Sequence, residues 1–353
     1  MPQHIISILH EDLQAIVQAD LPWSSFAGKT VLITGANGFL PAYLVETLLY
    51  LNQSVLAEPV RVIALVRNIA KARARFADAL DNPSLTFIEQ DVSQPIQLVE
   101  DVHFMVHAAS QASPKYYGTD PVGTLSANVL GTINIMRLAE EKRPKAVLYF
   151  SSSEVYGQLT EAQLPVAEHQ FGYLDPTQVR SCYAESKRMG ENICVSWASQ
   201  FGVPVKIARP FHTYGPGMAL DDGRVYADFV ADVLAGRDIR MKSNGTARRA
   251  FCYLADATAG FFTVLLRGTN GEAYNVGNPH QELSMLELAQ TVASLDAQAA
   301  ISVVEFQPPV NTLYLPSPVS RLTPDVNKLA DLGWQPVTTV ATGFARTIAS
   351  YSA

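Results

Sequence analysis

A buried strand, a glycine-rich turn and a helix follow one another near the start of the chain, and they constrain the fold more than any other feature. Residues 30–34 (Thr-Val-Leu-Ile-Thr) have the apolar, β-branched composition of a strand covered on both faces. The turn that follows contains Gly35 and Gly38, and a helix is expected over 41–51. In a dinucleotide-binding unit the first glycine allows the tight turn, and the second lets the backbone approach a pyrophosphate at the helix N-terminus. The third position of the motif, usually glycine, is Pro41, which a first helical turn tolerates.

Strands and helices alternate after this unit at the rhythm of a doubly wound parallel sheet. Further strands are predicted at 61–66, 86–92, 102–106, 147–150 and 205–210. The sequence therefore predicts an α/β protein with a Rossmann-like sheet. Its expected parts are an N-terminal helix (5–19) and linker within 1–27, a mainly dinucleotide-binding domain at 28–210 and a smaller, mainly substrate-binding domain at 211–353, with the chain crossing between the last two.

Composition narrows the class of protein. The chain has 353 residues, 48% of them hydrophobic and 17% charged, which is enough for a sizeable core. A net charge of −7 argues against a general binder of nucleic acid or anionic membranes, and no apolar run is long enough to span a bilayer. The N-terminus lacks the basic region and cleavage site of a secretory signal. Cys182, Cys194 and Cys252 show neither metal-ligand nor disulfide spacing, so we expect a cytoplasmic protein without a metal site.

A tyrosine and a lysine four residues apart, Tyr183 and Lys187, would lie on one face of a helix. A free tyrosine has a pKa of about 10, and a neighbouring ammonium group favours the phenolate. The strand at 147–150 leads into Ser152, whose hydroxyl could share the same substrate oxygen. This arrangement can take a proton from an alcohol while a hydride leaves its carbon. The catalytic candidates are Ser152, Ser153, Glu154, Tyr183 and Lys187.

The residues at the end of the second strand bear on whether the cofactor is NAD or NADP. An acid commonly stands there in NAD enzymes and binds the adenosine ribose, but here Val66 is followed by Arg67. Arg67 and the nearby Lys71 and Arg73 could receive the 2′-phosphate of NADP, stack on adenine or be solvated helix residues, so the residues alone leave NAD and NADP open. Asp91 could accept a hydrogen bond from the adenine amine, and His107 is expected to be structural or to line the cofactor. The cofactor-binding candidates are Gly35, Asn37, Gly38, Phe39, Leu40, Arg67, Asp91, Val92, Ala108, Ala109, Ser110, Asn128, Tyr183, Lys187 and Pro210.

Several further motifs occur in a shared order, at 107–121, 180–188, 214–225, 249–256 and 324–336. Together they make residues 28–350 resemble the extended short-chain dehydrogenases/reductases that modify nucleotide sugars. The motifs are most similar to those of UDP-glucuronate decarboxylases. The resemblance implies NAD as the cofactor, with NADP possible, a nucleotide-sugar substrate and a homodimer. The dimer would form through helices at about 121–141 and 183–200, with Val129, Ile133, Ile135 and Leu138 as apolar residues of the first.

The resemblance also implies a reaction. Oxidation of sugar carbon 4 would make the carbon 5 carboxylate a β-keto acid, carbon dioxide would leave, and the ketone would be reduced again. Tyr183 would be the base and later the acid, and Lys187 would lower its pKa and hold the nicotinamide ribose. Ser152 would bind the same sugar oxygen, with Ser153 and Glu154 near carbons 5 and 6. The substrate-binding candidates are Ser113, Tyr117, Arg180, His212, Arg224, Val225, Lys242, Arg249 and Arg321, where each of Arg180, Arg249 and Arg321 could instead form an ion pair within the fold.

Three positions depart from the decarboxylase pattern and leave the base and the sugar open. Gly217 stands where an arginine is usual, Lys242 stands where an aromatic residue usually stacks on uracil, and Pro41 replaces the third glycine. A 4,6-dehydratase would use the same residues with Glu154 as a base at carbon 5, whereas a 4-epimerase would leave Glu154 idle. A non-catalytic cofactor-binding protein is a further alternative, against which the intact Ser152, Tyr183 and Lys187 count.

Overall fold

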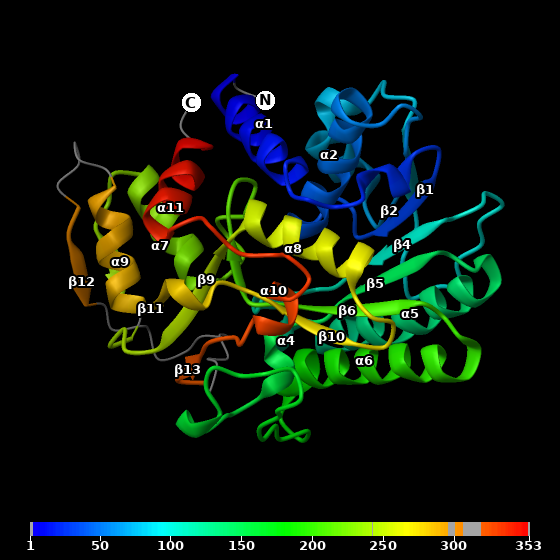
Figure 1. Ribbon diagram of the computed structural model, residues 1–353. Coiled ribbons are helices and arrows are strands. Elements are labelled where there is room, and N and C mark those ends of the chain that lie inside the picture. Colours follow the sequence, from blue (N-terminus) through cyan, green and yellow to red (C-terminus); the bar gives the residue numbers. More distant parts are fainter. Residues whose placement is uncertain (1–2, 242, 296–300, 306–318, 352–353) are drawn as a thin grey trace.

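The computed structural model describes residues 3–241, 243–295, 301–305 and 319–351, with a large parallel sheet beside a smaller mixed part (Figure 1). The large sheet has seven strands in the order β10-β6-β5-β4-β1-β2-β3, and every neighbouring pair is parallel. The strands are β1 (Thr30–Thr34), β2 (Arg61–Val66), β3 (Leu85–Glu89), β4 (Phe104–His107), β5 (Ala146–Phe150), β6 (Val205–Pro210) and β10 (Ala273–Val276). The doubly wound, Rossmann-like sheet predicted from the sequence is confirmed.

Helices cover both faces of this sheet, as parallel strands require. On one face α5 (Pro121–Lys142) and α6 (Cys182–Phe201) lie side by side (Figure 1). On the other lie α1 (Gln3–Val17), α2 (Phe39–Ser54) and α8 (Leu254–Arg267). The short helices α3 (Ile69–Arg75) and α4 (Lys115–Thr119) follow β2 and precede α5. The Asp120 carboxylate accepts from the backbone N–H of Gly123 at 3.0 Å and caps α5, a favoured start for a helix.

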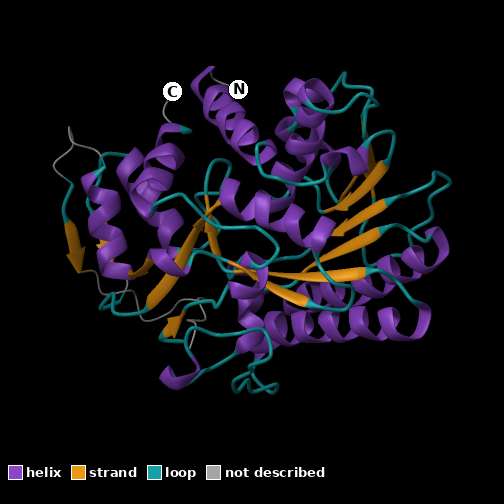
Figure 2. Ribbon diagram, in the orientation of Figure 1, coloured by secondary structure: helices purple, strands orange, loops and turns teal. Residues whose placement is uncertain are grey.

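The smaller part is built around β9 (Arg248–Tyr253), which joins strands from distant parts of the chain (Figure 2). Its other strands are β7 (His212–Tyr214), β11 (Glu282–Ser284) and β13 (Arg321–Leu322), with β8 (Ile239–Met241) and β12 (Val303–Glu305) as a separate pair. Its helices are α7 (Val225–Leu234), α9 (Met285–Ser294), α10 (Asn327–Ala330) and α11 (Val340–Ala349). Between β9 and β11 the chain crosses back through α8 and β10, so β10 becomes an edge strand of the large sheet.

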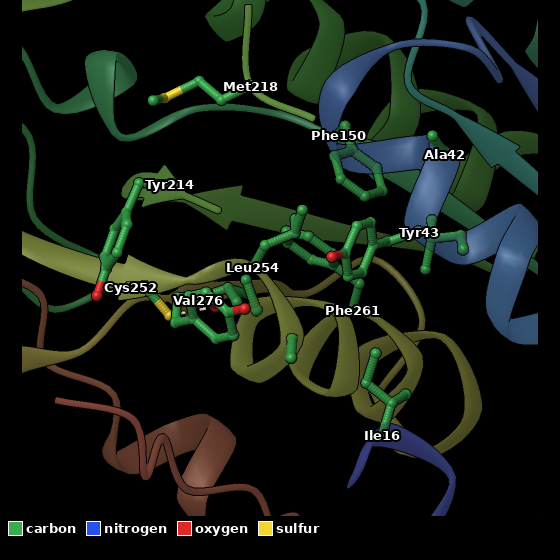
Figure 3. Close-up of a cluster of buried hydrophobic side chains, with 14 of the residues drawn as sticks. Ile16, Ala42, Tyr43, Phe150, Tyr214, Met218, Cys252, Leu254, Phe261 and Val276 are labelled. Carbon is green, nitrogen blue, oxygen red and sulfur yellow. Dashed lines mark hydrogen bonds between the residues drawn. The ribbon is translucent and has the colours of Figure 1, made fainter. Parts of the chain in front are cut away.

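A buried apolar cluster joins the two parts (Figure 3). Phe261 of α8 packs on Phe150 at the end of β5, with ring centroids 4.5 Å apart. Ile16 of α1 and Tyr43 of α2 belong to the same cluster, as does Tyr214 of β7. Burying apolar surface at about 25 cal/mol per Å² is the main force that holds such layers together.

Some element boundaries differ from those predicted. The third strand ends at Glu89, whereas residues 86–92 were predicted as strand, because the Asp91 side chain accepts from the backbone N–H of Ser93 at 2.8 Å and forms a turn. The helix after the glycine-rich turn begins at Phe39, two residues before the predicted start. Pro41 is therefore its third residue, where a helix has no partner for the missing N–H. The fourth strand begins at Phe104 rather than 102, and its last residue is His107.

The N-terminal segment is integrated with the rest. The helix predicted over 5–19 is α1, and its side chains Leu13 and Ile16 are buried. The expected linker contains a short 3₁₀ helix, Trp23–Phe26, whose two aromatic ends are also buried. All three cysteines are buried thiols. Of the helices in the part of the chain that the structure describes, none is long and apolar enough to cross a membrane.

Candidate active site

The glycine-rich turn lies close to the end of β4. Gly35 has a φ of +64°, and a Cβ atom added to it would lie 2.7 Å from Ala109 Cα, so only glycine fits there. Its backbone N–H donates to the carbonyl of Leu65 at 2.8 Å, which holds the turn against the end of β2. Gly38 is the N-cap of α2, and Phe39 begins that helix. The turn thus leaves helix N–H groups facing outward at the sheet edge, the geometry that binds a pyrophosphate.

His107 is a structural residue. Its Nδ1 lies 2.8 Å from Thr34 Oγ1 and its Nε2 lies 3.2 Å from Thr132 Oγ1, so it links β4 to β1 and α5. Burial, with a smaller effect from Lys187, lowers the pKa of His107 to about 3, and the ring is neutral. Thr34 Oγ1 also accepts from the backbone N–H groups of Ala108 and Ala109 at 3.2 and 3.1 Å, which fixes the strip predicted to pass the cofactor ribose.

Among the predicted site residues that the structure describes, four carry a buried polar atom without a hydrogen-bond partner. These atoms are Ser110 Oγ, Asn128 Oδ1, Arg180 Nε and His212 Nδ1. Gln111 Oε1, next to Ser110, is also buried without a hydrogen-bond partner, although Gln111 was not among the predicted site residues. Buried polar groups in native proteins are almost always hydrogen-bonded, so such atoms call for a polar ligand. They lie on the segments expected to bind a dinucleotide and a polar substrate, and the site therefore fits both.

The Tyr183–Lys187 pair lies in the first two turns of α6, and both side chains are buried. Lys187 Nζ donates to the carbonyl of Phe150 at 2.7 Å and lies 5.8 Å from the centre of the Tyr183 ring. Burial lowers the pKa of Lys187 to about 7. Asn128 Nδ2 donates to Ser186 Oγ at 2.9 Å, and Ser186 Oγ donates to the Tyr183 carbonyl at 2.9 Å, so α5 fixes the start of α6.

Several neighbouring groups set the pKa of Tyr183. Burial raises the pKa of Tyr183 to about 12, and the nearby Glu154 carboxylate adds to the rise. Hydrogen bonding with Ser152 is the largest opposing effect, followed by the charges of Arg224 and Arg180. Lys187 was expected to lower the pKa of Tyr183, and this role stays a prediction; the Lys187 ammonium donates to the Phe150 carbonyl. The close approach of Ser152 to Tyr183 is as predicted.

Glu154 lies in a stack of charged and aromatic groups. Arg180 Nη1 and Nη2 donate to Oε2 and Oε1 of Glu154 at 2.8 and 3.2 Å. The Arg180 guanidinium lies 4.8 Å from the centre of the Tyr117 ring, and Tyr117 stacks on Tyr183 with centroids 5.0 Å apart. Ser153, next to Glu154, is buried. The structure thus brings the catalytic candidates together with Tyr117 and Arg180, which come from two other segments.

A second group of predicted residues borders this stack. Ser113 Oγ donates to the carbonyl of Asp222, and Arg224 Nη1 donates to the Asp222 carboxylate at 2.6 Å. Asp222 was not among the predicted site residues, although its place two residues before Arg224 favours such a pair. Val225 begins α7. His212 lies against the Tyr226 and Phe251 rings, and burial, Arg249 and Arg224 hold its pKa well below 6.5.

The remaining candidates have partners within the protein. Arg321 donates to both Glu282 oxygens at 2.7 and 3.0 Å and to Glu161 at 2.8 Å, so the alternative of an ion pair within the fold applies to it. Arg249 donates to the backbone carbonyls of 248, 319 and 320. Asp91 caps its own turn, and the Val92 carbonyl accepts from Asn134. Pro210 ends β6 and Asn37 lies in the glycine-rich turn, whereas Lys242 lies outside the described residues.

This combination of a seven-stranded parallel sheet, a glycine-rich β1–α2 turn and a buried Tyr-x-x-x-Lys pair defines a dinucleotide-binding protein of the short-chain dehydrogenase/reductase type. Residues 31–277 match the NAD dependent epimerase/dehydratase family, and the chain belongs to that family. It is 35% identical over 308 residues to UDP-glucuronic acid decarboxylase 6 of Arabidopsis thaliana, covering 87% of this chain and 84% of that protein. It is 33% identical to UDP-glucuronic acid decarboxylase 1 of Danio rerio, covering 92% and 73%.

Solved structures show the same fold. UDP-glucuronic acid 4-epimerase from Bacillus cereus, in complex with UDP-glucuronic acid and NAD, has a TM-score of 0.77 at 19% identity and covers 90% of this chain and 98% of that one. The dTDP-glucose 4,6-dehydratase DesIV from Streptomyces venezuelae, with NAD and TYD bound, has a TM-score of 0.76 at 25% identity and covers 91% and 96%. Because the 4-epimerase is only 19% identical to this chain, its similarity shows a shared fold and nothing about activity.

Proposed function

We propose that this protein is an NAD-dependent enzyme that modifies a nucleotide sugar by transient oxidation of sugar carbon 4, and that its reaction is the decarboxylation of a UDP-hexuronic acid. The observation that carries the proposal is the placement of Ser152, the buried Tyr183 and the buried Lys187 together at the carboxyl end of β5, where Lys187 Nζ donates to the Phe150 carbonyl. Ligands bind at that edge of an open parallel sheet. The names of the relatives, which are UDP-glucuronic acid decarboxylases, support the substrate class.

Each residue has a role in this reaction. NAD held at the glycine-rich turn of Gly35 and Gly38 would supply the hydride acceptor for carbon 4 and the hydride for the later reduction. Tyr183 accepts the proton of the carbon 4 hydroxyl in its phenolate form, which Ser152 and the charges of Arg224 and Arg180 favour, and Ser152 hydrogen-bonds to the same oxygen. The carbon 5 carboxylate is then β to a ketone, so the bond between carbons 5 and 6 breaks and its electron pair moves toward the ketone oxygen. A proton from water adds at carbon 5 and restores the ketone, and Tyr183 returns its proton to the carbon 4 oxygen when the ketone is reduced.

The position of Glu154 favours decarboxylation over 4,6-dehydration. A dehydratase needs a carboxylate with a free lone pair directed at the carbon 5 proton. Both Glu154 oxygens already accept hydrogen bonds from Arg180, in the two-point geometry that makes such pairs strong. A carboxylate held at both oxygens by one guanidinium is fixed in orientation toward Arg180 and is not free to turn toward carbon 5. Loss of carbon dioxide needs no base at carbon 5, so the pair is compatible with decarboxylation, where its role is to shape the site around carbons 5 and 6.

The experiment that tests this function is a substrate panel. Purified protein with NAD is incubated with UDP-, dTDP-, GDP- and CDP-linked hexoses and hexuronic acids, and the products are identified by mass. A product lighter by one carbon dioxide from UDP-glucuronate supports the proposal. A product lighter by one water from a neutral hexose would identify a dehydratase, and an isomer of equal mass would identify an epimerase. Either result without decarboxylation overturns the proposed reaction.

The two structural parts have different roles in the proposed function. We propose that the large sheet, including β10, binds the dinucleotide and that the smaller part supplies the substrate site, through His212, Arg224, Val225 and Arg249. We also propose that the protein works in the reducing environment of the cytoplasm, which the three buried thiols support.

A homodimer through α5 and α6 is a further part of the proposal. Of the apolar residues expected on its interface, Ile135 and Leu138 instead pack in the protein's own core against the sheet, as residues of crossover helices do. Other apolar side chains of the same pair of helices are exposed. They are Val122, Leu125 and Leu130 on α5 and Met189 and Phe201 on α6. A neighbouring set of exposed apolar side chains is typical of a protein–protein interface.

A further inference from the structure

A buried ion pair lies next to the turn that carries the catalytic candidates. Glu191 of α6 accepts from Arg209 Nε at 2.8 Å through Oε1 and from Arg209 Nη2 at 2.6 Å through Oε2. Arg209 stands on β6, and both side chains are buried. Ser151, the residue after β5, donates from its hydroxyl to Oε1 of the same carboxylate. A buried carboxylate with three donors is fixed in place and in orientation.

The same ion pair reaches the other end of this turn. Tyr156 closes the short 3₁₀ helix Ser153–Tyr156, and its hydroxyl accepts from Arg209 Nη1 at 2.9 Å. This hydroxyl also donates to Asn275 Oδ1 of β10 at 2.5 Å. The turn that begins after Ser151 is therefore held at both ends by one ion pair, and it is tied to two further strands of the large sheet.

The carboxylate of the pair is also the neighbour of the buried lysine. Glu191 follows Lys187 by four residues, so the two lie on one face of α6, one turn apart. Lys187 Nζ donates to the carbonyl of Phe150, the residue before Ser151. The ammonium group and the carboxylate are thus attached to adjacent residues at the end of β5. Burial is the largest effect on the pKa of Lys187 and lowers it to about 7, whereas Cys194 and Glu191 oppose the fall.

The other titratable groups around Lys187 are uncharged near neutral pH. Burial raises the pKa of the Cys194 thiol on α6 and of the Tyr149 hydroxyl on β5, whose ring centre lies 5.2 Å from Lys187 Nζ. Burial lowers the pKa of His107 on β4 to about 3, and it raises the pKa of Tyr183 to about 12. In the part of the chain that the structure describes, the carboxylate of the ion pair is therefore the negative charge that acts on the ammonium.

We propose that Glu191 is a positioning residue of this active site, which fixes the turn with Ser152 and provides the counter-charge of Lys187. The inference rests on the proposed function, in which the Lys187 ammonium favours the phenolate of Tyr183. A carboxylate one helical turn away favours that ammonium, because the two charges attract each other at a buried place. Arg209 keeps the carboxylate ionised and oriented. Glu191 thus acts through its neighbours and not on the sugar or the cofactor.

The test compares the wild type with Glu191→Gln and Tyr156→Phe. Glutamine keeps the shape of the side chain but removes its charge, whereas Tyr156→Phe loosens the same turn and leaves the charge in place. The protonation of Lys187 is followed by ¹³C NMR of protein labelled at lysine Cε, and the signal that Lys187→Met lacks is that of Lys187. We expect the midpoint of this titration to fall by about one pH unit in Glu191→Gln, because the charge that favours the ammonium is gone. In Tyr156→Phe the midpoint should stay at the wild-type value.

Turnover gives the second readout. We expect kcat to fall about 10- to 100-fold in both variants, the scale of a displaced catalytic group, with KM within about twofold of the wild type. The alkaline limb of the kcat profile, where Lys187 loses its proton, should move to lower pH in Glu191→Gln but not in Tyr156→Phe. A purely structural role would lower kcat equally at every pH.

An unchanged Lys187 midpoint in Glu191→Gln overturns the inference, and so does a wild-type kcat in that variant. If Glu191→Gln does not fold, the double variant Glu191→Gln/Arg209→Met, which replaces the whole pair by neutral side chains, takes its place in both measurements. The NMR titration needs no substrate, so it tests the role of Glu191 even if the reaction differs from the one proposed. A folded wild type without turnover on any nucleotide sugar would contradict the proposed function alone.

Discussion

At the scale of single residues, the phenol of Tyr183 is the group on which the proposed chemistry depends. Substituting phenylalanine for it removes one oxygen and keeps the ring that stacks on Tyr117 at 5.0 Å. We expect Tyr183→Phe to lower turnover by about 10²- to 10⁴-fold, the usual contribution of a positioned acid–base group. Cofactor binding and the unfolding transition should be unchanged. Near-normal turnover of this variant on the true substrate would show that the mechanism is wrong.

Glu154 allows a second prediction that separates the possible reactions. In Glu154→Gln the amide keeps the shape of the side chain but cannot accept a proton. If the protein is a decarboxylase, we expect a loss of about tenfold or less, because the Arg180 pair is weakened while no proton transfer is lost. If it is a dehydratase, product formation should collapse while oxidation at carbon 4 persists, seen as a build-up of the reduced nicotinamide absorbance. An epimerase should show almost no change.

The buried ammonium of Lys187 predicts a pH dependence of stability. Its pKa is about 7 in the folded protein, against an ordinary value of 10.5. Between these pH values the unfolded chain holds a proton that the folded protein does not, so this group makes the free energy of unfolding rise with pH. The slope is at most about 1.4 kcal/mol per pH unit. The destabilisation is complete below pH 7 and is relieved as the pH rises toward 10.

The measurement is urea denaturation of the wild type and of Lys187→Met between pH 7 and 9. The methionine has a similar volume and no titrating group. We expect the wild type to gain stability relative to this variant as the pH rises. Parallel pH profiles for the two proteins would mean that the ammonium is not destabilised by burial.

At the scale of elements, α5 and α6 form the pair of helices with exposed apolar side chains. Leu130 of α5 is 49% exposed and Met189 of α6 is 50% exposed. Two charges introduced by Leu130→Arg and Met189→Arg should convert the proposed dimer into a monomer, because a buried unpaired charge opposes association strongly. Light scattering at micromolar concentration reads the mass of each variant. Val99→Arg, at a loop residue that is 96% exposed, is the matched control and should leave the dimer intact. A monomeric wild type would contradict the proposed interface.

At the scale of the whole molecule, α1 connects the two parts through one buried carboxylate. Asp12, only 3% exposed, accepts hydrogen bonds from Tyr43 of α2 at 3.0 Å, from Tyr253 of β9 at 2.8 Å and from Arg346 of α11 at 2.8 Å. These donors belong to three elements that are far apart in the sequence. The N-terminal helix therefore braces the large sheet against the smaller part.

This arrangement predicts a large loss of stability for Asp12→Ala. Removing the carboxylate leaves two buried hydroxyls and a partly buried guanidinium without their acceptor, which should cost about 3 kcal/mol, the scale for a buried pair that loses one member. Glu11→Ala is the control, because Glu11 also pairs with Arg346, at 2.8 Å, but from the surface. It should cost under about 1 kcal/mol. Urea denaturation measures both, and equal losses would show that Asp12 does not brace the parts.

The sequence alone determined the features that depend on near neighbours in the chain. The glycine-rich turn after β1 and the alternation of strands and helices predicted the parallel sheet, because a backbone conformation and the burial of one strand are local properties. The Tyr183–Lys187 spacing and the strand leading into Ser152 predicted the proton-transfer group for the same reason, since one helix and one strand end place these residues.

Tertiary structure alone decided what occupies the space between distant segments. In the site, it paired Glu154 with Arg180, stacked Tyr117 on Tyr183 and directed Lys187 to the Phe150 carbonyl. Elsewhere it paired Arg321 with Glu282 and hydrogen-bonded Asp12 to Tyr253, which is 241 residues away. Periodicity and spacing carry no information on which of several arginines meets which carboxylate. That choice is made when whole elements pack and each buried charge must find a partner at a single place in the fold.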